Sequence, residues 1–311
     1  MTNNATIAVR TQEQAAPSKW LAAARQFGVV WSNTKARIGI IILAVFVLVA
    51  ILAPLLAPYG ASQNGFPRSA DATADHWMGT TAAGEDVLSQ IIYGARISVL
   101  VGAVAGFLST LVAVAIGLSW GYVRGWIAEV IGFIVNLFLV IPGLPLMIVI
   151  AAYLQNGGIA VIIAVIVVTG WAWGARVLRS QTQSLRGRDF VTAAQFSGDG
   201  ATRIVFREIL PNMTSLIVGS FFGAATSAIL AEAGLEFLGL GDSSIVSWGT
   251  ILYWAQNSNA LLTGQWILLF APGLCIALLA MSLTLINFGV DAVSNPRLRE
   301  GARRKRKEVT A

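Results

Sequence analysis

Histidine and cysteine are almost absent from this sequence, and lysine is scarce. Among 311 residues, His76 is the single histidine and Cys275 the single cysteine. These numbers exclude a disulfide within the chain, a metal site built from several cysteines and a histidine cluster. A phosphate-binding loop of the form GxxxxGK[ST] needs a lysine in that setting, and none of the lysines has it (Lys19, Lys35, Lys305 and Lys307). We therefore expect no catalytic site, metal site or cofactor in this chain.

Charged residues are also few. They make up 12% of the chain, against roughly 25% in average soluble proteins, while 56% of the residues are hydrophobic and the mean hydropathy is +0.72. This balance leaves too little polar surface to cover a water-soluble globule and favours an integral membrane protein. The first apolar run exceeds the roughly 7–15 residues of a signal peptide, so we interpret it as a retained anchor.

Six apolar runs are long enough to cross a membrane. About 20 apolar residues span the hydrocarbon layer as a helix, and a helix satisfies its own backbone hydrogen bonds there. The sequence thus predicts an all-α polytopic membrane protein with six transmembrane helices. The predicted spans are 38–57, 97–121, 129–153, 159–177, 213–231 and 266–290.

The third span contains two prolines and an asparagine, namely Pro142, Pro145 and Asn136. Proline inside a helix is expected to kink it, and the carbonyl groups freed by a kink can line a cavity. The prolines therefore fit a transport pathway and simple packing equally well. Asn136 either faces such a pathway or bonds a neighbouring helix.

Basic residues predict the orientation, because cytoplasmic segments of membrane proteins are enriched in Lys and Arg. With the N-terminus in the cytoplasm, 19 of the 21 basic residues lie inside, and only Arg68 and Arg96 lie outside. We expect both termini to be cytoplasmic. Residues 1–37 form a partly disordered segment with a candidate amphipathic helix, and 38–293 form the transmembrane domain. The basic tail 294–311 is expected to meet anionic lipid rather than nucleic acid.

Two longer segments, 58–96 and 232–264, are expected on the outer side. The second is glycine-rich and semi-apolar, which favours short re-entrant or surface-lying helices that seek a partner. In the first segment, His76 lies near three acids, Asp75, Glu85 and Asp86. For His76 we favour a structural role over a metal site. Three outer tryptophans suit sugar stacking or, as we favour, the membrane interface (Trp248, Trp254 and Trp266).

The predicted spans hold no acidic residue near mid-membrane. Intramembrane carboxylates are the usual mark of proton- or ion-coupled transport. The sequence therefore favours transport energised by another protein. A self-sufficient channel or an ion-coupled carrier is the alternative from another class.

The largest inner loop, 178–212, is polar and lies between two apolar runs. Its alanines and Phe196 have helical spacing, and a Ser-Gly-Asp-Gly turn follows them. Asp199 is the expected N-cap of a second short helix, and Pro211 is expected to limit that helix. The pattern predicts two short helices joined at a glycine bend. The alternative is a plain amphipathic connector on the bilayer surface.

This loop resembles the "EAA" loop of ABC-importer permeases, which has Glu-Ala-Ala, three residues, Gly, nine residues, and Ile-x-Leu-Pro. The chain keeps the spacing, but Thr192 stands at the position of the Glu and Glu208 at the position of the Ile. The resemblance implies a coupling helix that docks into a groove on an ATP-hydrolysing subunit. The residues carried over are Thr192, Ala193, Ala194, Gly198, Leu210 and Pro211.

Further motifs resemble the dipeptide/oligopeptide/nickel permeases. They are HWMGTTAAGEDVLSQIIYGARISVLVG from His76, AEAGLEFLGLG, SWGTIL and NPRLR from Asn295, although Thr81 and Glu85 depart from the family's usual Asp and Arg. The resemblance covers about residues 35–300. It implies a type I ABC-importer permease of the bacterial inner membrane, importing peptides or alternatively oligosaccharides or nickel. Its implied partners are a second homologous permease, an extracytoplasmic solute-binding protein and two ATPase subunits that bind ATP and Mg.

Overall fold

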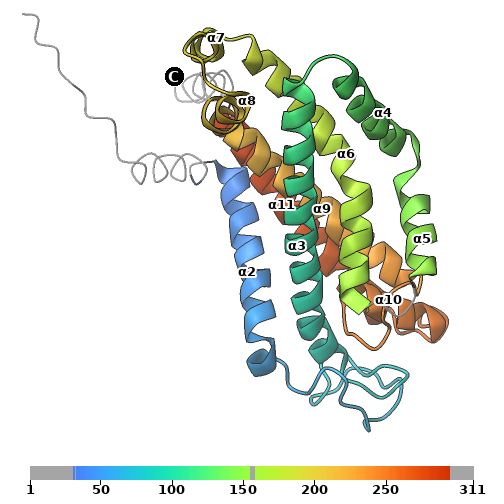
Figure 1. Cartoon of the computed structure of the whole chain (residues 1–311). Coiled ribbons are helices and arrows are strands. Elements are labelled where there is room, and N and C mark those ends of the chain that lie inside the picture. The colour runs from blue at the N-terminus through green and yellow to red at the C-terminus, as the bar shows by residue number, and fades with distance from the viewer. Residues whose placement is uncertain (1–30, 32, 155–157, 295–311) are drawn as a thin grey trace, which may run out of the picture.

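The computed structural model describes residue 31, residues 33–154 and residues 158–294, with side chains described up to Val290. Helices are the only regular elements in these ranges, apart from one isolated bridge between Thr80 and Asp86. The all-α prediction is confirmed (Figure 1). In chain order the long helices are α2 (Thr34–Leu56), α3 (Val87–Tyr122), α4 (Trp126–Val140), α5 (Gly143–Tyr153), α6 (Gly158–Arg186), α9 (Thr214–Phe237), α10 (Trp248–Asn257) and α11 (Ile267–Ser294).

Five helices in the described residues are long and apolar enough to cross a membrane, and the bent pair α4 and α5 brings the number to six when it is counted as one span. The six predicted spans therefore each correspond to a helix or a bent helix pair. The predicted terminal segments fall almost entirely outside the described residues. The cytoplasmic orientation of both termini stays a prediction.

Several helices extend well beyond the predicted apolar runs. α3 begins ten residues before the predicted position, because the Asp86 side chain accepts a hydrogen bond from Ser89 N at 2.8 Å and caps the helix. α6 continues to Arg186, so the inner loop is shorter than the predicted 178–212. The apolar run measures only the part of a helix inside the hydrocarbon, whereas backbone hydrogen bonds continue through the polar turns on either side.

The third span is broken rather than merely kinked. α4 and α5 meet at 88°, and Pro142 is the residue before the first turn of α5. Pro145 lies within that first turn, where its missing N–H has no helical partner to lose. The kink predicted at the two prolines is confirmed, and it amounts to a complete break between two helices.

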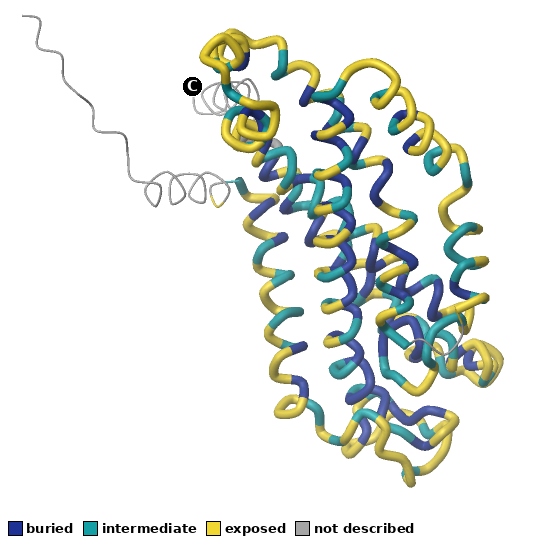
Figure 2. The backbone as a smooth tube through the Cα atoms, viewed as in Figure 1, coloured by how far each residue is buried: buried dark blue, intermediate teal, exposed yellow. Residues whose placement is uncertain are grey.

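α3 lies at the centre of the bundle and packs against α6, α9 and α2. Small residues allow these close approaches. A Cβ added at Gly106 would lie 2.7 Å from Ala225 Cα of α9, and one at Gly117 would lie 2.8 Å from the Ala175 carbonyl oxygen of α6. By contrast, α2 exposes most of its isoleucine, leucine and valine side chains, as a lipid-facing helix does. Most of the α2 tube is accordingly coloured as exposed or intermediate (Figure 2).

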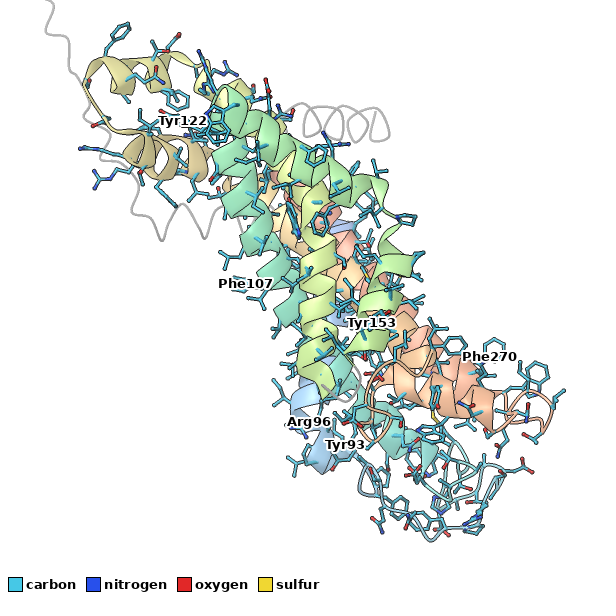
Figure 3. The ribbon with its side chains drawn as sticks, turned by 45° about the vertical axis from the view of Figure 1, so that its right-hand side comes forward. Tyr93, Arg96, Phe107, Tyr122, Tyr153 and Phe270 are labelled. Atoms are coloured by element: carbon cyan, nitrogen blue, oxygen red, sulfur yellow. The ribbon has the colours of Figure 1, made fainter. Side chains whose placement is uncertain are left out.

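The bundle is elongated, and its two ends carry different loops (Figure 1). The short helices α7 (Asp189–Phe196) and α8 (Ala201–Ile204) lie at one end. The loop between α2 and α3 lies at the other end, near α10. α3 connects the two, with Tyr122 at the α7 end and Tyr93 and Arg96 at the opposite end (Figure 3).

Candidate functional site

The loop after α6 forms a helix–glycine–helix module, residues 187–213, as its sequence pattern predicts. α7 ends in a left-handed turn at Gly198, whose φ is +81°. Gly198 N donates to Gln195 O at 3.0 Å, and Asp199 N donates to Ala194 O at 3.1 Å. These two bonds form a Schellman motif, which needs a residue with positive φ and therefore favours glycine.

The module has a buried face and an exposed face. Val191, Ile204 and Ile209 are buried in one cluster with Leu178 of α6, so the module is anchored to the end of the bundle. The opposite face exposes aromatic rings: Phe196 is 89% exposed, and Phe206 is 59% exposed. An exposed apolar surface of this kind marks a contact with a partner protein or with the membrane.

The residues carried over from the EAA resemblance come together in this module. Thr192, Ala193 and Gly198 are exposed, Ala194 is half-buried beside the core, and Leu210 packs into the same cluster as Ile209. Pro211 is exposed in the 3-10 turn that precedes α9. Among the described residues, nothing covers the exposed side chains of this face, and the coupling roles of the carried-over residues stay predictions.

Two details of the module differ from the sequence-based expectation. Asp199 does not cap α8, because Gly200 holds the N-cap position and the Asp199 carboxylate pairs with Arg203 Nε at 3.2 Å instead. Pro211 does not end the helical path. A π turn (Val205–Ile209) and a 3-10 turn (Leu210–Met213) carry the chain past it into α9. Changing the hydrogen-bond register accommodates the missing proline N–H.

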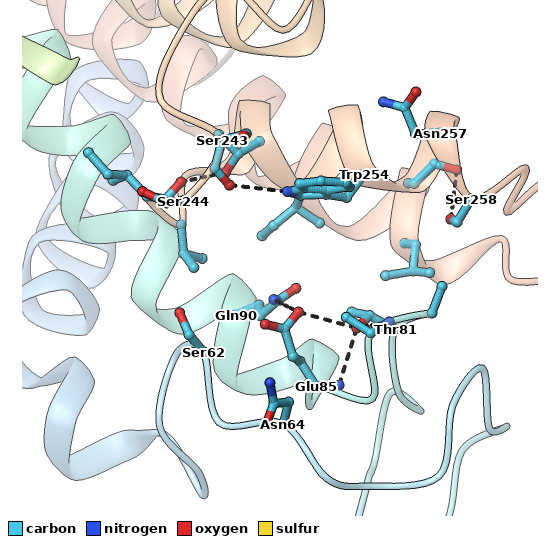
Figure 4. A pocket seen from close by; sticks show the side chains of 18 of the residues that line it. Ser62, Asn64, Thr81, Glu85, Gln90, Ser243, Ser244, Trp254, Asn257 and Ser258 are labelled. Atoms are coloured by element: carbon cyan, nitrogen blue, oxygen red, sulfur yellow. Dashed lines mark hydrogen bonds between the residues drawn. The ribbon is translucent and has the colours of Figure 1, made fainter. Parts of the chain in front are cut away.

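At the opposite end, the two predicted outer segments fold against each other. Trp248 Nε1 of α10 donates to the Ile91 carbonyl of α3 at 3.0 Å, and Gln265 Nε2 donates to the Thr80 carbonyl at 3.3 Å. Residues from both segments line a cavity of about 750 Å³. Glu85, Gln90 and Trp254 project into it (Figure 4).

Polar contacts fix the lining of this outer cavity. Gln90 Nε2 donates to Glu85 Oε2 at 2.8 Å, and Trp254 Nε1 donates to the Ser243 carbonyl at 3.2 Å (Figure 4). At its rim, the hydroxyl and backbone N–H of Ser244 bond the Asp242 carboxylate and hold the pKa of Asp242 below its ordinary value. Asp242 therefore carries a negative charge at the rim of this cavity near neutral pH.

His76 makes a polar contact and ring contacts within the loop between α2 and α3. Its Nδ1 lies 2.9 Å from Asp86 Oδ1, and both side chains are buried. The His76 ring also packs against Tyr59 and Phe66. No group of three or more metal-ligating side chains occurs among the described residues.

The three outer tryptophans have separate environments. Trp248 is fully buried and packs edge-to-face on Phe46 of α2 at 5.4 Å, so both alternatives considered for it from the sequence are wrong. Trp254 lines the outer cavity and is 53% exposed. Trp266 is exposed and stacks on Phe270. Sequence position alone does not reveal that Trp248 lies in the core.

Two acids that the sequence assigned to the outer loop belong to the last turns of α9. Glu232 and Glu236 are both buried, and Ser98 Oγ of α3 donates to Glu232 Oε2 at 3.3 Å. A Cβ on Gly241 would lie 2.3 Å from the Glu236 carboxyl group. Gly241, in the LGLG stretch at 238–241, thus lets the chain pass directly over a buried carboxyl group. The apolar pattern of the sequence did not indicate this.

A second cavity of about 460 Å³ lies within the membrane-spanning bundle. Residues of α3, α6 and α9 provide most of its lining, together with Met147 of α5 and Asn287 of α11. Asn136 is not among the lining residues; its Oδ1 accepts a hydrogen bond from Arg176 of α6. Pro142 and Pro145 do not line it either. The contact observed for Asn136 is thus the bond to a neighbouring helix, one of its two predicted alternatives.

Two known protein families match this chain. Residues 113–300 match the family of binding-protein-dependent transport system inner membrane components, and residues 22–72 match the N-terminal TM domain of oligopeptide transport permease C. The chain is 35% identical over 291 residues to the dipeptide transport system permease protein DppC of Alkalihalophilus pseudofirmus, covering 91% of this chain and 92% of that protein.

Two proteins of Bacillus subtilis are also similar. The chain is 32% identical to its dipeptide transport system permease protein DppC over 271 residues, covering 86% of this chain and 83% of the relative. It is 32% identical to its oligopeptide transport system permease protein OppC over 272 residues, covering 86% and 88%. This chain, a multi-pass membrane protein, belongs to the family of binding-protein-dependent transport system inner membrane components.

Proposed function

We propose that this chain is one of two permease subunits of an ATP-driven importer of peptides. The main support is the helix–glycine–helix module at one end of a six-span bundle. The relatives of the chain are peptide-transport permeases. The chain supplies one wall of the pathway, and a related permease supplies the other. Because its lysines do not form a phosphate-binding loop, ATP hydrolysis is assigned to two separate ATPase subunits, which also bind Mg.

The module is the proposed contact with an ATPase. Its buried face ties it to α6, and α8 leads through the π and 3-10 turns directly into α9. A displacement of the exposed face would therefore move two membrane helices together. In energetic terms, the ATPase would bias a two-state equilibrium between inward-open and outward-open arrangements by binding one state better than the other.

The opposite end is the proposed contact with an extracytoplasmic solute-binding protein. The loops around the outer cavity are internally bonded, so they present a preformed surface to a partner. Peptide cargo is supported by the relatives, whose names include dipeptide and oligopeptide transport. Of the three tryptophans considered for sugar stacking, Trp248 is buried and unavailable, whereas Trp254 and Trp266 are exposed.

Transport assays in proteoliposomes test the proposal. Trialanine uptake is expected only when this chain is reconstituted with the second permease, the ATPases, the binding protein and ATP. ATP-independent uptake by this chain alone would instead identify a channel or an ion-coupled carrier, and would overturn the proposal.

A variant of the module tests the ATPase contact directly. Phe196→Ala removes a ring that is 89% exposed, so folding is expected to be unaffected. Copurification of the ATPases is expected to fall about tenfold or more, as for an interface anchor. Trp77→Ala, which removes a similarly exposed ring from the outer loop, is the matched control and is expected to retain them. Equal ATPase recovery from both variants would argue against this contact.

A further inference from the structure

The cavity within the bundle is a groove between α6 and α9, with α3 along its base. Ser109, Thr110 and Ala113 of α3 are buried along this base. α3 packs closely on both neighbouring helices. Ser109 precedes the inner end of α3 at Tyr122 by 13 residues, or about 20 Å of helix. The groove therefore lies within the depth of the hydrocarbon layer, which is about 30 Å thick.

The groove is lined by a mixture of large apolar side chains, small residues and polar residues; the apolar ones are Met147, Ile166, Trp171, Trp173, Val177 and Leu216. Its walls include Gly170 and Gly174 of α6, and Ser220, Gly223 and Ser227 of α9. The outer surface of α2, which exposes Ile, Leu and Val, shows the contrast. Acyl chains would offer no hydrogen-bond partner to the serine and asparagine side chains of this lining, and burying such polar groups in hydrocarbon costs free energy.

Two buried polar atoms in the groove point to a ligand. Ser109 is 3% exposed, and its Oγ has no hydrogen-bond partner among the described residues. Asn287 Oδ1, also in the lining, is buried and likewise bonds no other described residue. A buried polar group without a hydrogen-bond partner destabilises the structure that contains it. A ligand that offers N–H and C=O groups would remove this destabilisation.

The chemistry of these atoms distinguishes between possible occupants. A transmembrane helix has its backbone groups bonded internally and offers none to the groove. A lipid chain offers none at all. An extended peptide carries one free N–H and one free C=O at each non-proline residue, and these groups are independent of its side chains.

We propose that this groove binds the main chain of a peptide in transit, with Ser109 and Asn287 as the residues that recognise its amide groups. The inference rests on the proposed function and adds a binding subsite to it. A site that reads the backbone would accept peptides with different side chains. It would discriminate against cargo that lacks amide N–H groups.

Filling the groove is the first test. A Cβ on Gly223 would meet nothing within 4 Å, so Gly223→Leu is expected to insert a side chain into the groove without disturbing α9. The matched control is Gly234→Leu, on the same helix, equally unobstructed and outside the groove lining. In the complete importer, trialanine uptake is expected to fall about tenfold for the first variant only, while ATP hydrolysis continues.

The second test removes the proposed hydrogen bond in two ways, once by changing the protein and once by changing the peptide. Ser109→Ala is expected to slow trialanine uptake about three- to tenfold, the size of one net hydrogen bond. Uptake of trialanine with N-methylated peptide bonds is expected to be slow in the unaltered importer and to change little further in the variant. Equal slowing of both peptides by Ser109→Ala would overturn the inference.

Other outcomes are equally decisive. Failure of Gly223→Leu to assemble with the second permease would make the groove a helix–helix interface and overturn the inference. Normal uptake by both the Gly223→Leu and the Ser109→Ala variants would overturn it as well, while leaving the proposed function intact. Lack of trialanine uptake by the unaltered importer would overturn both.

Discussion

Gly198 and Gly200 lie two residues apart in the same turn, yet only one of them requires glycine. Gly198 has φ +81° and closes the Schellman motif, whereas Gly200 has φ −71°, which any residue adopts. A Cβ at either position would meet nothing within 4 Å. The two glycines therefore differ in backbone conformation and not in available space.

This difference yields a matched pair of variants. Gly198→Ala is expected to destabilise the turn by about 1–2 kcal/mol, the cost of a left-handed non-glycine residue. It should uncouple ATP hydrolysis from peptide uptake while membrane insertion stays normal. Gly200→Ala is the control and should retain coupling. The ratio of uptake to ATP hydrolysis in proteoliposomes measures the effect, and an unchanged ratio in Gly198→Ala would contradict the coupling role.

Single residues also show where sequence reasoning stopped. The glycine bend at Gly198 was predicted because its turn chemistry is local. The assignment of Asp199 as an N-cap was wrong because the carboxylate pairs with Arg203 instead. The burial of Trp248 was missed because its partners, Phe46 and Ile91, belong to α2 and α3. Such contacts between distant segments leave no pattern in the sequence around the residue itself.

At the scale of elements, close packing around α3 depends on small residues at helix crossings. An alanine at Gly106 would put its Cβ 2.7 Å from the backbone of Ala225, which cannot rotate away as a side chain would. The helices α3 and α9 would then have to separate. Gly143, at the first turn of α5, has open space instead.

Thermal unfolding of the purified protein in detergent tests this packing. Gly106→Ala is expected to destabilise the protein by about 1–3 kcal/mol, as overpacked positions do. Gly143→Ala should have no effect or should stabilise it slightly, because alanine restricts the unfolded chain. Equal midpoints for the two variants would show that the α3–α9 crossing tolerates a methyl group.

The whole molecule places its two proposed contact surfaces at opposite ends of the bundle (Figure 1). This separation agrees with a subunit that meets an ATPase on one side of the membrane and a binding protein on the other. The positive-inside distribution of Lys and Arg predicts which end is cytoplasmic.

Labelling of single cysteines tests the orientation. With Cys275→Ala as background, Ser197→Cys in the module and Asn64→Cys in the outer loop each provide one exposed thiol. A membrane-impermeant maleimide is expected to label Asn64→Cys in intact spheroplasts. Ser197→Cys should react only after permeabilisation. The reverse pattern would invert the topology and place the module outside the cell.

The sequence by itself determined the membrane class, the all-α fold, the six spans and the helix–glycine–helix module. Each of these follows from apolar run length or from turn chemistry within about 20 adjacent residues. Tertiary structure decided the pairing of the two outer segments, the burial of Glu232 and Glu236, and the groove with its unpartnered Ser109. These features depend on how helices far apart in the chain cross, and small residues set that crossing without indicating their partners.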